Sequence, residues 1–134
     1  MINLKDVIQD TKTAEIEYPN CKGFMVRVGL VTRPMANKIR KDCTVTKMSE
    51  RYSSMEETID EEKFSVEFTK AAVKGWSGLT GEHIKSLLPV DDSVKDEDDI
   101  PYSLDNAIML VKNCSAFETW LNEVVFKLKY FRSE

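Results

Sequence analysis

The chain has 134 residues, 42% of them hydrophobic and 31% charged, which is typical of one folded globular domain and atypical of a disordered chain. A net charge of −4 and a pI near 5.2 argue against a general nucleic-acid binder and against a peripheral membrane protein. No apolar stretch approaches the roughly 20 residues of a membrane span, and the first ten residues do not resemble a secretory signal. We therefore expect a cytoplasmic protein with free thiols.

The N-terminal third is predicted to form a β-hairpin followed by a helix. Apolar and polar residues alternate on both sides of the turn sequence 19–23, which predicts two strands that pack on helices. Thr32 and Pro34 are typical of a helix start, and the basic residues 33–41 continue that helix. Residues 44–58 are polar and weakly periodic, so we expect a mobile loop with short helical stretches there.

The middle of the chain is predicted to be helical. Asp60 caps a helix that runs to about Lys74, and Gly75 serves as its C-terminal cap. A second, short helix begins at Thr80. Residues 91–99 are strongly acidic and are predicted to form an exposed loop.

Two further helices close the chain. Ser103 starts the first of them, and Ser115 with Glu118 forms a capping box at the start of the second. Behind that box, an apolar stripe is expected to continue along one helix from Phe117 to Phe131. The predicted fold class is therefore mainly α, a compact helical domain with a small N-terminal β-hairpin packed on it, in a single domain spanning residues 1–134.

Residue patterns typical of catalysis or metal binding do not come together in this sequence. His83 is the only histidine, and the cysteines have no zinc-ligand spacing to it. Residues 91–99 lack the mid-loop glycine of a calcium-binding loop. Residues 75–78 lack a lysine in the register of a phosphate-binding loop. We therefore expect no enzymatic activity, no cofactor and no metal site.

Three segments together carry a more specific pattern. Residues 73–79 place a tryptophan and a Gly-x-x-Gly turn at the predicted helix end, residues 100–107 open the next helix after the acidic loop, and residues 115–131 form a phenylalanine-marked helix. In this order they resemble the tail assembly chaperones of long-tailed, siphovirus-type bacteriophages. The likeness covers residues 60–132, more than half of the chain. The family often has a glycine within its acidic connector, and this sequence has none there.

The resemblance implies a non-enzymatic binding role in the host bacterial cytoplasm. Members of this family bind the tape measure protein, a long and mostly helical polypeptide, keep it soluble and help tail tube subunits to polymerise around it. In many phages a longer, frameshifted form recruits the tail tube protein, and members often self-associate. The alternatives are a structural tail or head–tail completion protein that stays in the virion, and a small phage regulator.

The residues that flank the acidic loop are the predicted partner-facing ridge: Trp76, Ile100, Pro101 and Tyr102. The alternative interpretation is that Trp76 and Tyr102 pin two helices into the core. Methionines are the other candidates, because their adaptable side chains suit either a contact surface or a core filler. The internal ones are Met25, Met35, Met48, Met55 and Met109.

Overall fold

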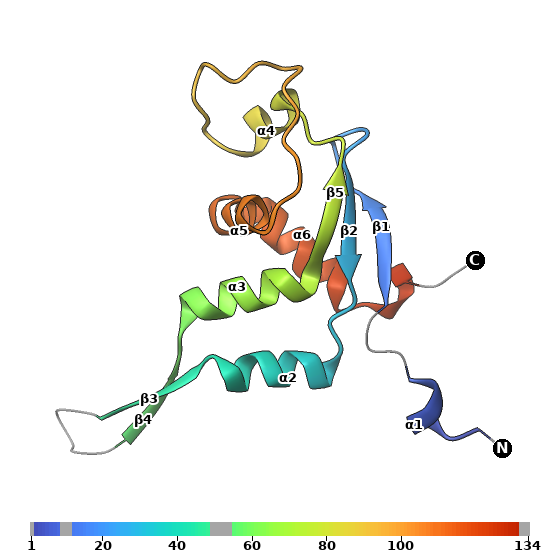
Figure 1. The fold of residues 1–134 in the computed structure, drawn as a ribbon, viewed down its shortest axis with the longest axis vertical. Coiled ribbons are helices and arrows are strands. Elements are labelled where there is room, and N and C mark those ends of the chain that lie inside the picture. Colours follow the sequence, from blue (N-terminus) through green and yellow to red (C-terminus); the bar gives the residue numbers. More distant parts are fainter. Residues whose placement is uncertain (1, 9–11, 49–54, 132–134) are drawn as a thin grey trace.

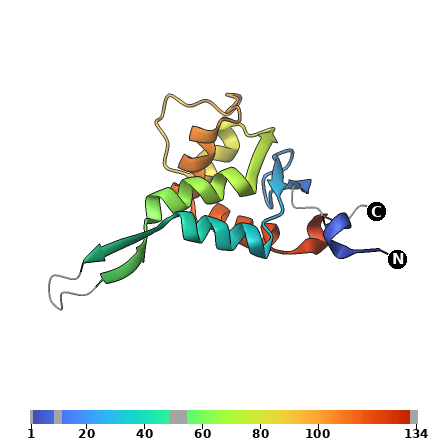
Figure 2. The ribbon, with the colours of Figure 1, turned by 60° about the horizontal axis from the view of Figure 1, so that its bottom comes forward.

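The computed structural model describes residues 2–8, 12–48 and 55–131 of the chain. A three-stranded sheet stands at the centre, and a two-stranded ribbon extends away from it at the far end of two neighbouring helices (Figures 1 and 2). Helices α3 (Glu61–Ala72) and α6 (Ser115–Val125) both pack against strand β2 (Met25–Gly29), and α5 (Leu104–Asn113) packs against both helices. In the described part of the chain, every helix is too short or too polar to cross a lipid bilayer.

The central sheet is antiparallel throughout and has the order β1-β2-β5. Strand β1 (Thr13–Glu17) pairs with β2, and Ile16 lies opposite Val26, so the predicted N-terminal hairpin is confirmed. Burial alternates along β2, because Val26 and Val28 are buried while Arg27 between them is exposed. The sheet therefore turns one apolar face toward the helices.

The predicted fold class, mainly α with a small hairpin, is wrong. The structure has 49% helix and 21% strand, with a three-stranded antiparallel sheet and a separate two-stranded sheet, which makes it mixed α and β. The third strand, β5 (Val73–Ser77), follows α3 directly and pairs with β2, so Gly75 is a strand residue and not a helix cap. Val73 and Trp76 are residue types that strands favour, and the backbone of β5 finds its partners on β2.

The prediction of a loop over residues 44–58 is also wrong where the structure describes it. Strands β3 (Thr44–Met48) and β4 (Met55–Ile59) pair antiparallel, and the remaining residues 49–54 lie outside the described residues. Alternating threonine, valine and isoleucine give these segments strand propensity. At the base of this ribbon, the backbone N–H of Asp60 donates to the carbonyl of Cys43 at 2.7 Å, and Lys63 Nζ donates to the carbonyl of Asp42 at 3.0 Å.

The helix starts predicted from capping residues are confirmed in four places. Each capping side chain accepts a hydrogen bond from the backbone N–H three residues later. The capping residues are Thr32 for α2 (Arg33–Asp42), Asp60 for α3, Thr80 for α4 (Gly81–Leu87) and Ser103 for α5. A short N-terminal helix, α1 (Leu4–Val7), has only exposed side chains.

The C-terminal helix differs from its prediction at both ends. Its N-cap is Cys114, which makes no side-chain capping bond, so the predicted Ser115–Glu118 capping box is wrong. The physical reason is that Cys114 is both the C-cap of α5 and the N-cap of α6, so it is the single residue between the two helices. Helix α6 stops at Val125, and Phe131 reaches the core from a separate 3₁₀ turn, η1 (Leu128–Phe131).

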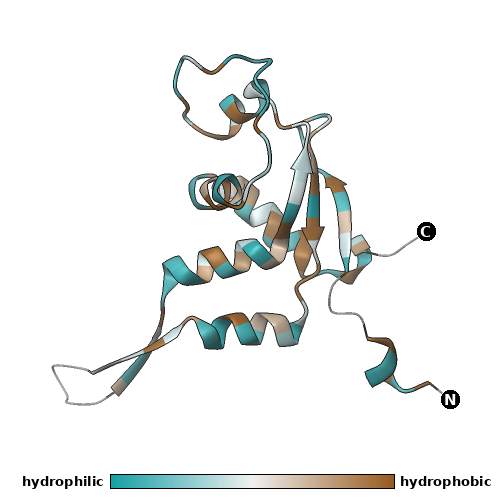
Figure 3. Ribbon diagram, viewed as in Figure 1, coloured by the Kyte–Doolittle hydropathy of each residue, from teal (hydrophilic) through white to brown (hydrophobic). Residues whose placement is uncertain are grey.

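Aromatic rings fill the centre of the core. Phe24 and Phe117 are fully buried and stack with centroids 6.4 Å apart, and Tyr18 contacts both of them at 5.8 and 5.5 Å. Aromatic pairs of this kind stabilise a core beyond the area that they bury. Hydrophobic residues accordingly mark β2 and the helices beside it, whereas residues 91–99 are mainly hydrophilic (Figure 3).

Candidate protein-binding site

The four residues of the predicted ridge come together at the edge strand β5. Trp76 Nε1 donates a hydrogen bond to the carbonyl of Ile100 at 2.9 Å, and the Tyr102 hydroxyl donates to the carbonyl of Val73 at 3.1 Å. The rings of Trp76 and Tyr102 meet edge to face with centroids 5.2 Å apart. Pro101 is exposed, and its carbonyl accepts from Asn106 Nδ2 at 2.9 Å.

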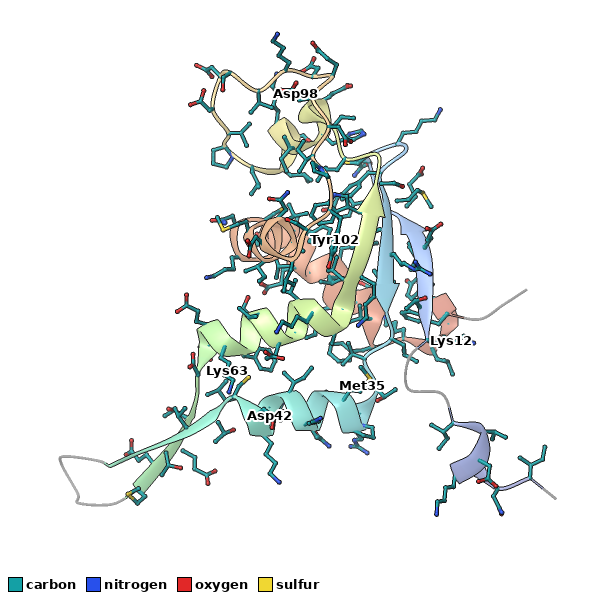
Figure 4. All side chains as sticks on the ribbon, in the orientation of Figure 1. Lys12, Met35, Asp42, Lys63, Asp98 and Tyr102 are labelled. Atoms are coloured by element: carbon teal, nitrogen blue, oxygen red, sulfur yellow. The ribbon has the colours of Figure 1, made fainter. Side chains whose placement is uncertain are left out.

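These contacts give Trp76 and Tyr102 a structural role. They fasten the segment that enters α5 to the free edge of the sheet, and Tyr102 points between β5 and α5 (Figure 4). Burial raises the pKa of the Tyr102 hydroxyl, which keeps it protonated and able to donate. The alternative interpretation, that the two rings pin two helices into the core, holds only in part, because both rings are half-buried and they join strand β5 to the segment before α5. A role for the ridge in partner contact stays a prediction.

We call the contacts of Trp76 and Tyr102 the brace. A hollow lies beside it, between α4 and α5. It consists of two adjoining depressions of about 150 Å³ and about 310 Å³, which share the lining residues Leu88 and Met109. We call the two together the α4–α5 hollow. Its lining residues are Trp76, Leu79, Ile84, Leu88, Pro89, Ile100, Asn106, Met109, Leu110 and Asn113.

The lining of the α4–α5 hollow is mostly apolar and carries no charged side chain. Each of its two asparagines donates one side-chain N–H to the backbone, because Asn106 donates to the carbonyl of Pro101 and Asn113 donates to the carbonyl of Met109 at 2.8 Å. Met109 is 56% exposed, although its neighbours Leu110 and Val111 are buried. The hollow therefore offers apolar contact around a flexible thioether at its mouth.

An acidic loop adjoins α4, and none of its residues lines the α4–α5 hollow. Residues 91–99 form a loop, as predicted, and its backbone is fastened to the start of α4. The N–H of Gly81 donates to the carbonyl of Asp98 at 2.7 Å, and Lys85 pairs with Asp96 at 2.9 Å. A Cβ at Gly81 would stand 1.8 Å from the carbonyl oxygen of Lys95, so only glycine permits this close approach.

A second depression lies between α2 and α3 and has a volume of about 330 Å³. Its floor contains Met35, Ile39 and Ala71, and Met35 lies on the side of α2 that faces α3 (Figure 4). The other lining residues are charged: Lys38, Asp42, Glu67, Lys70 and Lys74. Because charges surround its small apolar floor, this depression is a poorer site for an apolar side chain than the α4–α5 hollow.

The histidine and the three cysteines are engaged or buried. His83 Nε2 lies 3.1 Å from the carbonyl of Lys22, which is a structural contact. Burial raises the pKa of the Cys21 and Cys43 thiols and so lowers their nucleophilicity. Within residues 2–8, 12–48 and 55–131, no group of three His, Cys, Asp or Glu side chains is placed to hold a metal ion.

The predicted site overlaps the α4–α5 hollow only in part. Trp76 and Ile100 line it, whereas Pro101 and Tyr102 do not. The prediction missed the contribution of α4, through Ile84 and Leu88. Met109 is the residue whose position could have indicated more of the hollow, because it lies off the buried stripe of α5. In the sequence it is one methionine among several.

Comparison with protein-family models, with curated proteins and with solved structures found no match.

Proposed function

We propose that this chain is a non-enzymatic binding protein, a tail assembly chaperone of a long-tailed bacteriophage whose client is the tape measure protein. The single observation that carries the proposal is the uncharged α4–α5 hollow with the half-exposed Met109 at its mouth. Such a surface takes up apolar side chains from one face of a client helix. The work would be done in the host cytoplasm.

The chemistry of the hollow suits a client with many different apolar anchors. Methionine is flexible and polarisable, so Met109 adapts to side chains of different shapes. Since Asn106 and Asn113 are already hydrogen-bonded, docking an apolar group buries few polar atoms without partners. This combination favours a carrier that binds repeated apolar positions along a helix over one that reads a single sequence.

The charge of the chain supports the same role. Residues 91–99 carry six carboxylates and one lysine, on a chain with a net charge of −4. Excess charge of one sign keeps a carrier and its complexes apart from one another. Client helices with lysine or arginine next to their apolar stripe are therefore expected to bind best.

The sequence pattern adds independent support. Trp76 and Ile100, from the first two segments of the resemblance, line the hollow, and the second segment leads into α5, which forms one of its walls. One part of the pattern is corrected, because Trp76 lies on β5 and not at a helix end. By the same resemblance, we propose that a longer form of the chain recruits the tail tube protein.

The test is binding of fragments of the tape measure protein encoded by the same phage. Met109→Lys places a charge at the mouth of the hollow, and we expect it to weaken binding by about tenfold or more. Met55→Lys is the matched control, because Met55 is 62% exposed but lies on the ribbon. If both variants bind as tightly as wild type, the client contacts another surface. If wild type does not bind, the tape measure protein is not the client.

Purified virions separate the chaperone from a structural tail or completion protein. A chaperone is expected to be absent from mature particles, so abundant peptides of this chain in their mass spectra would overturn the proposal. A salt-sensitive shift of DNA by the purified protein would instead favour the regulator.

A further inference from the structure

A third depression lies between α3 and α6, over α5, and the proposed function does not use it. Its volume is about 180 Å³, and it shares no lining residue with the α4–α5 hollow. We call it the α3–α6 pocket. Its lining residues are Glu61, Phe64, Ser65 and Phe68 on α3, Val111 on α5, and Glu118 and Asn122 on α6.

The size of the α3–α6 pocket suits one long side chain. A volume of about 180 Å³ holds roughly six water molecules at the density of the liquid. It is smaller than the roughly 300 Å³ at which sites for small-molecule ligands begin. Phe68 and Val111 are buried, Phe64 is half-buried, and Glu118 is exposed, so the pocket has an apolar interior and a charged rim.

The charge of this rim is of one sign. The two charged residues of the lining are Glu61 and Glu118, which come from different helices. The α4–α5 hollow has no charged lining residue, and the depression between α2 and α3 has both signs. In the part of the chain that the structure describes, neither Glu61 nor Glu118 forms an ion pair.

The lysines closest to the pocket in the sequence are engaged elsewhere. Lys63 Nζ donates to the carbonyl of Asp42 at 3.0 Å, and Lys112 Nζ lies 3.6 Å from the carboxylate of Glu62. Neither lysine lines the pocket. Among the described residues, the two rim carboxylates thus have no cation of their own, and a positively charged group from another molecule would complement them.

Two aromatic rings give the interior a preference among cations. The rings of Phe64 and Phe68 are parallel within 8°, with centroids 6.1 Å apart. Aromatic faces attract cations, and arginine is favoured because its flat guanidinium stacks on a ring. A stacked guanidinium keeps its N–H donors at its edge, where carboxylates accept from them. The ammonium group of lysine is compact and strongly hydrated, so it gains less from a ring.

We propose that the α3–α6 pocket binds the guanidinium group of an arginine side chain from a partner protein. The guanidinium lies against the ring of Phe64 and donates to the carboxylates of Glu61 and Glu118. The methylene groups of the arginine contact Phe68 and Val111. This inference does not depend on the proposed function, because it uses neither the tape measure protein nor the α4–α5 hollow.

NMR titration with three capped peptides tests the pocket. With Gly-Gly-Arg-Gly-Gly, we expect saturable shifts of the backbone amide signals of Ser65, Val111 and Asn122. A citrulline peptide, in which a neutral urea group replaces the guanidinium, is expected to bind about tenfold more weakly, and a lysine peptide about threefold more weakly. The proposal fails if the arginine peptide causes no saturable shift at these residues, or if either of the other peptides binds as tightly.

Neutralising the rim tests the two carboxylates. Glu61→Gln/Glu118→Gln is expected to weaken binding of the arginine peptide by about tenfold. Glu15→Gln/Glu82→Gln is the matched control, because it removes two exposed carboxylates that lie outside the pocket and is expected to bind like wild type. If both variants weaken binding equally, net charge is responsible and the proposal is wrong.

Replacing one ring tests the stacking contact. Phe64→Leu keeps an apolar side chain without the ring, and we expect it to weaken arginine binding about threefold and to remove the preference over lysine. Phe126→Leu is the control, because Phe126 stacks on Phe68 at 6.0 Å but does not line the pocket. Thermal unfolding establishes that both variants are folded. An unchanged preference in Phe64→Leu would contradict the proposed contact.

Discussion

The body and the arm of this protein use strands in opposite ways. In the body, meaning the sheet β1-β2-β5 with helices α3, α4, α5 and α6, β2 buries one face against α3 and α6. In the arm, meaning α2, β3 and β4, every described side chain of the ribbon is at least partly exposed. A two-stranded ribbon is marginal by itself, so what distinguishes the two regions is tertiary support and not strand propensity.

This difference assigns the two regions different tasks. The body holds the aromatic cluster and the brace that shapes the α4–α5 hollow. The arm contributes little buried surface, and among its described side chains only Cys43, between α2 and β3, is buried. Substitutions in the body are therefore expected to change the free energy of unfolding, and substitutions in the arm are expected to change contacts with other molecules.

The largest effect is expected from Phe117→Ala. Phe117 is fully buried and lies 5.5 Å from Tyr18 and 5.7 Å from Trp120, measured between ring centroids. Removing the ring leaves a cavity at the centre of the body, and we expect a loss of about 3–5 kcal/mol in the free energy of unfolding. Urea unfolding followed by tryptophan fluorescence measures it; a loss below about 1 kcal/mol would contradict the packing described for the body.

An intermediate effect is expected from Gly81→Ala. The new methyl group would meet the carbonyl of Lys95, so the acidic loop has to move, at a cost of about 1–3 kcal/mol. Thermal unfolding gives the cost, and faster hydrogen exchange at Gly81 and Glu82 would report the detached loop. Gly75→Ala is the matched control, because the nearest atom to its new methyl group is 3.9 Å away and stability should hardly change.

The smallest effect is expected from Met55→Ser on the arm. The side chain of Met55 is exposed, as are the other side chains of β4. The free energy of unfolding should therefore change by less than about 0.5 kcal/mol. Chemical denaturation beside wild type measures this. A loss comparable to that of Gly81→Ala would show that the ribbon is packed against something, and the contrast between arm and body would fail.

Short sequence patterns correctly predicted the helix starts, which depend on residues close together in the chain. Thr32, Asp60, Thr80 and Ser103 cap their helices because capping involves residues only three positions apart. Strand β5 was missed because its partner, β2, lies far away in the sequence, and without that partner a glycine after a helix is typical of a cap.

The α4–α5 hollow was predicted only through Trp76 and Ile100 for a similar reason. Its lining comes from β5, α4, the segment before α5, and α5 itself, which the fold alone brings together. Periodicity along α5 places Met109 off the buried stripe, but it does not show that Ile84 and Leu88 lie across the hollow from it.

The hydrogen bonds at the base of the ribbon have a mechanical consequence. The bonds from Asp60 to Cys43 and from Lys63 to Asp42 fasten the ribbon to the start of α3, and α3 passes into β5 without a loop. Ribbon, helix and edge strand are thus joined in series without a loop between them. A displacement of the ribbon is therefore expected to reach the strand that carries Trp76, which lines the hollow.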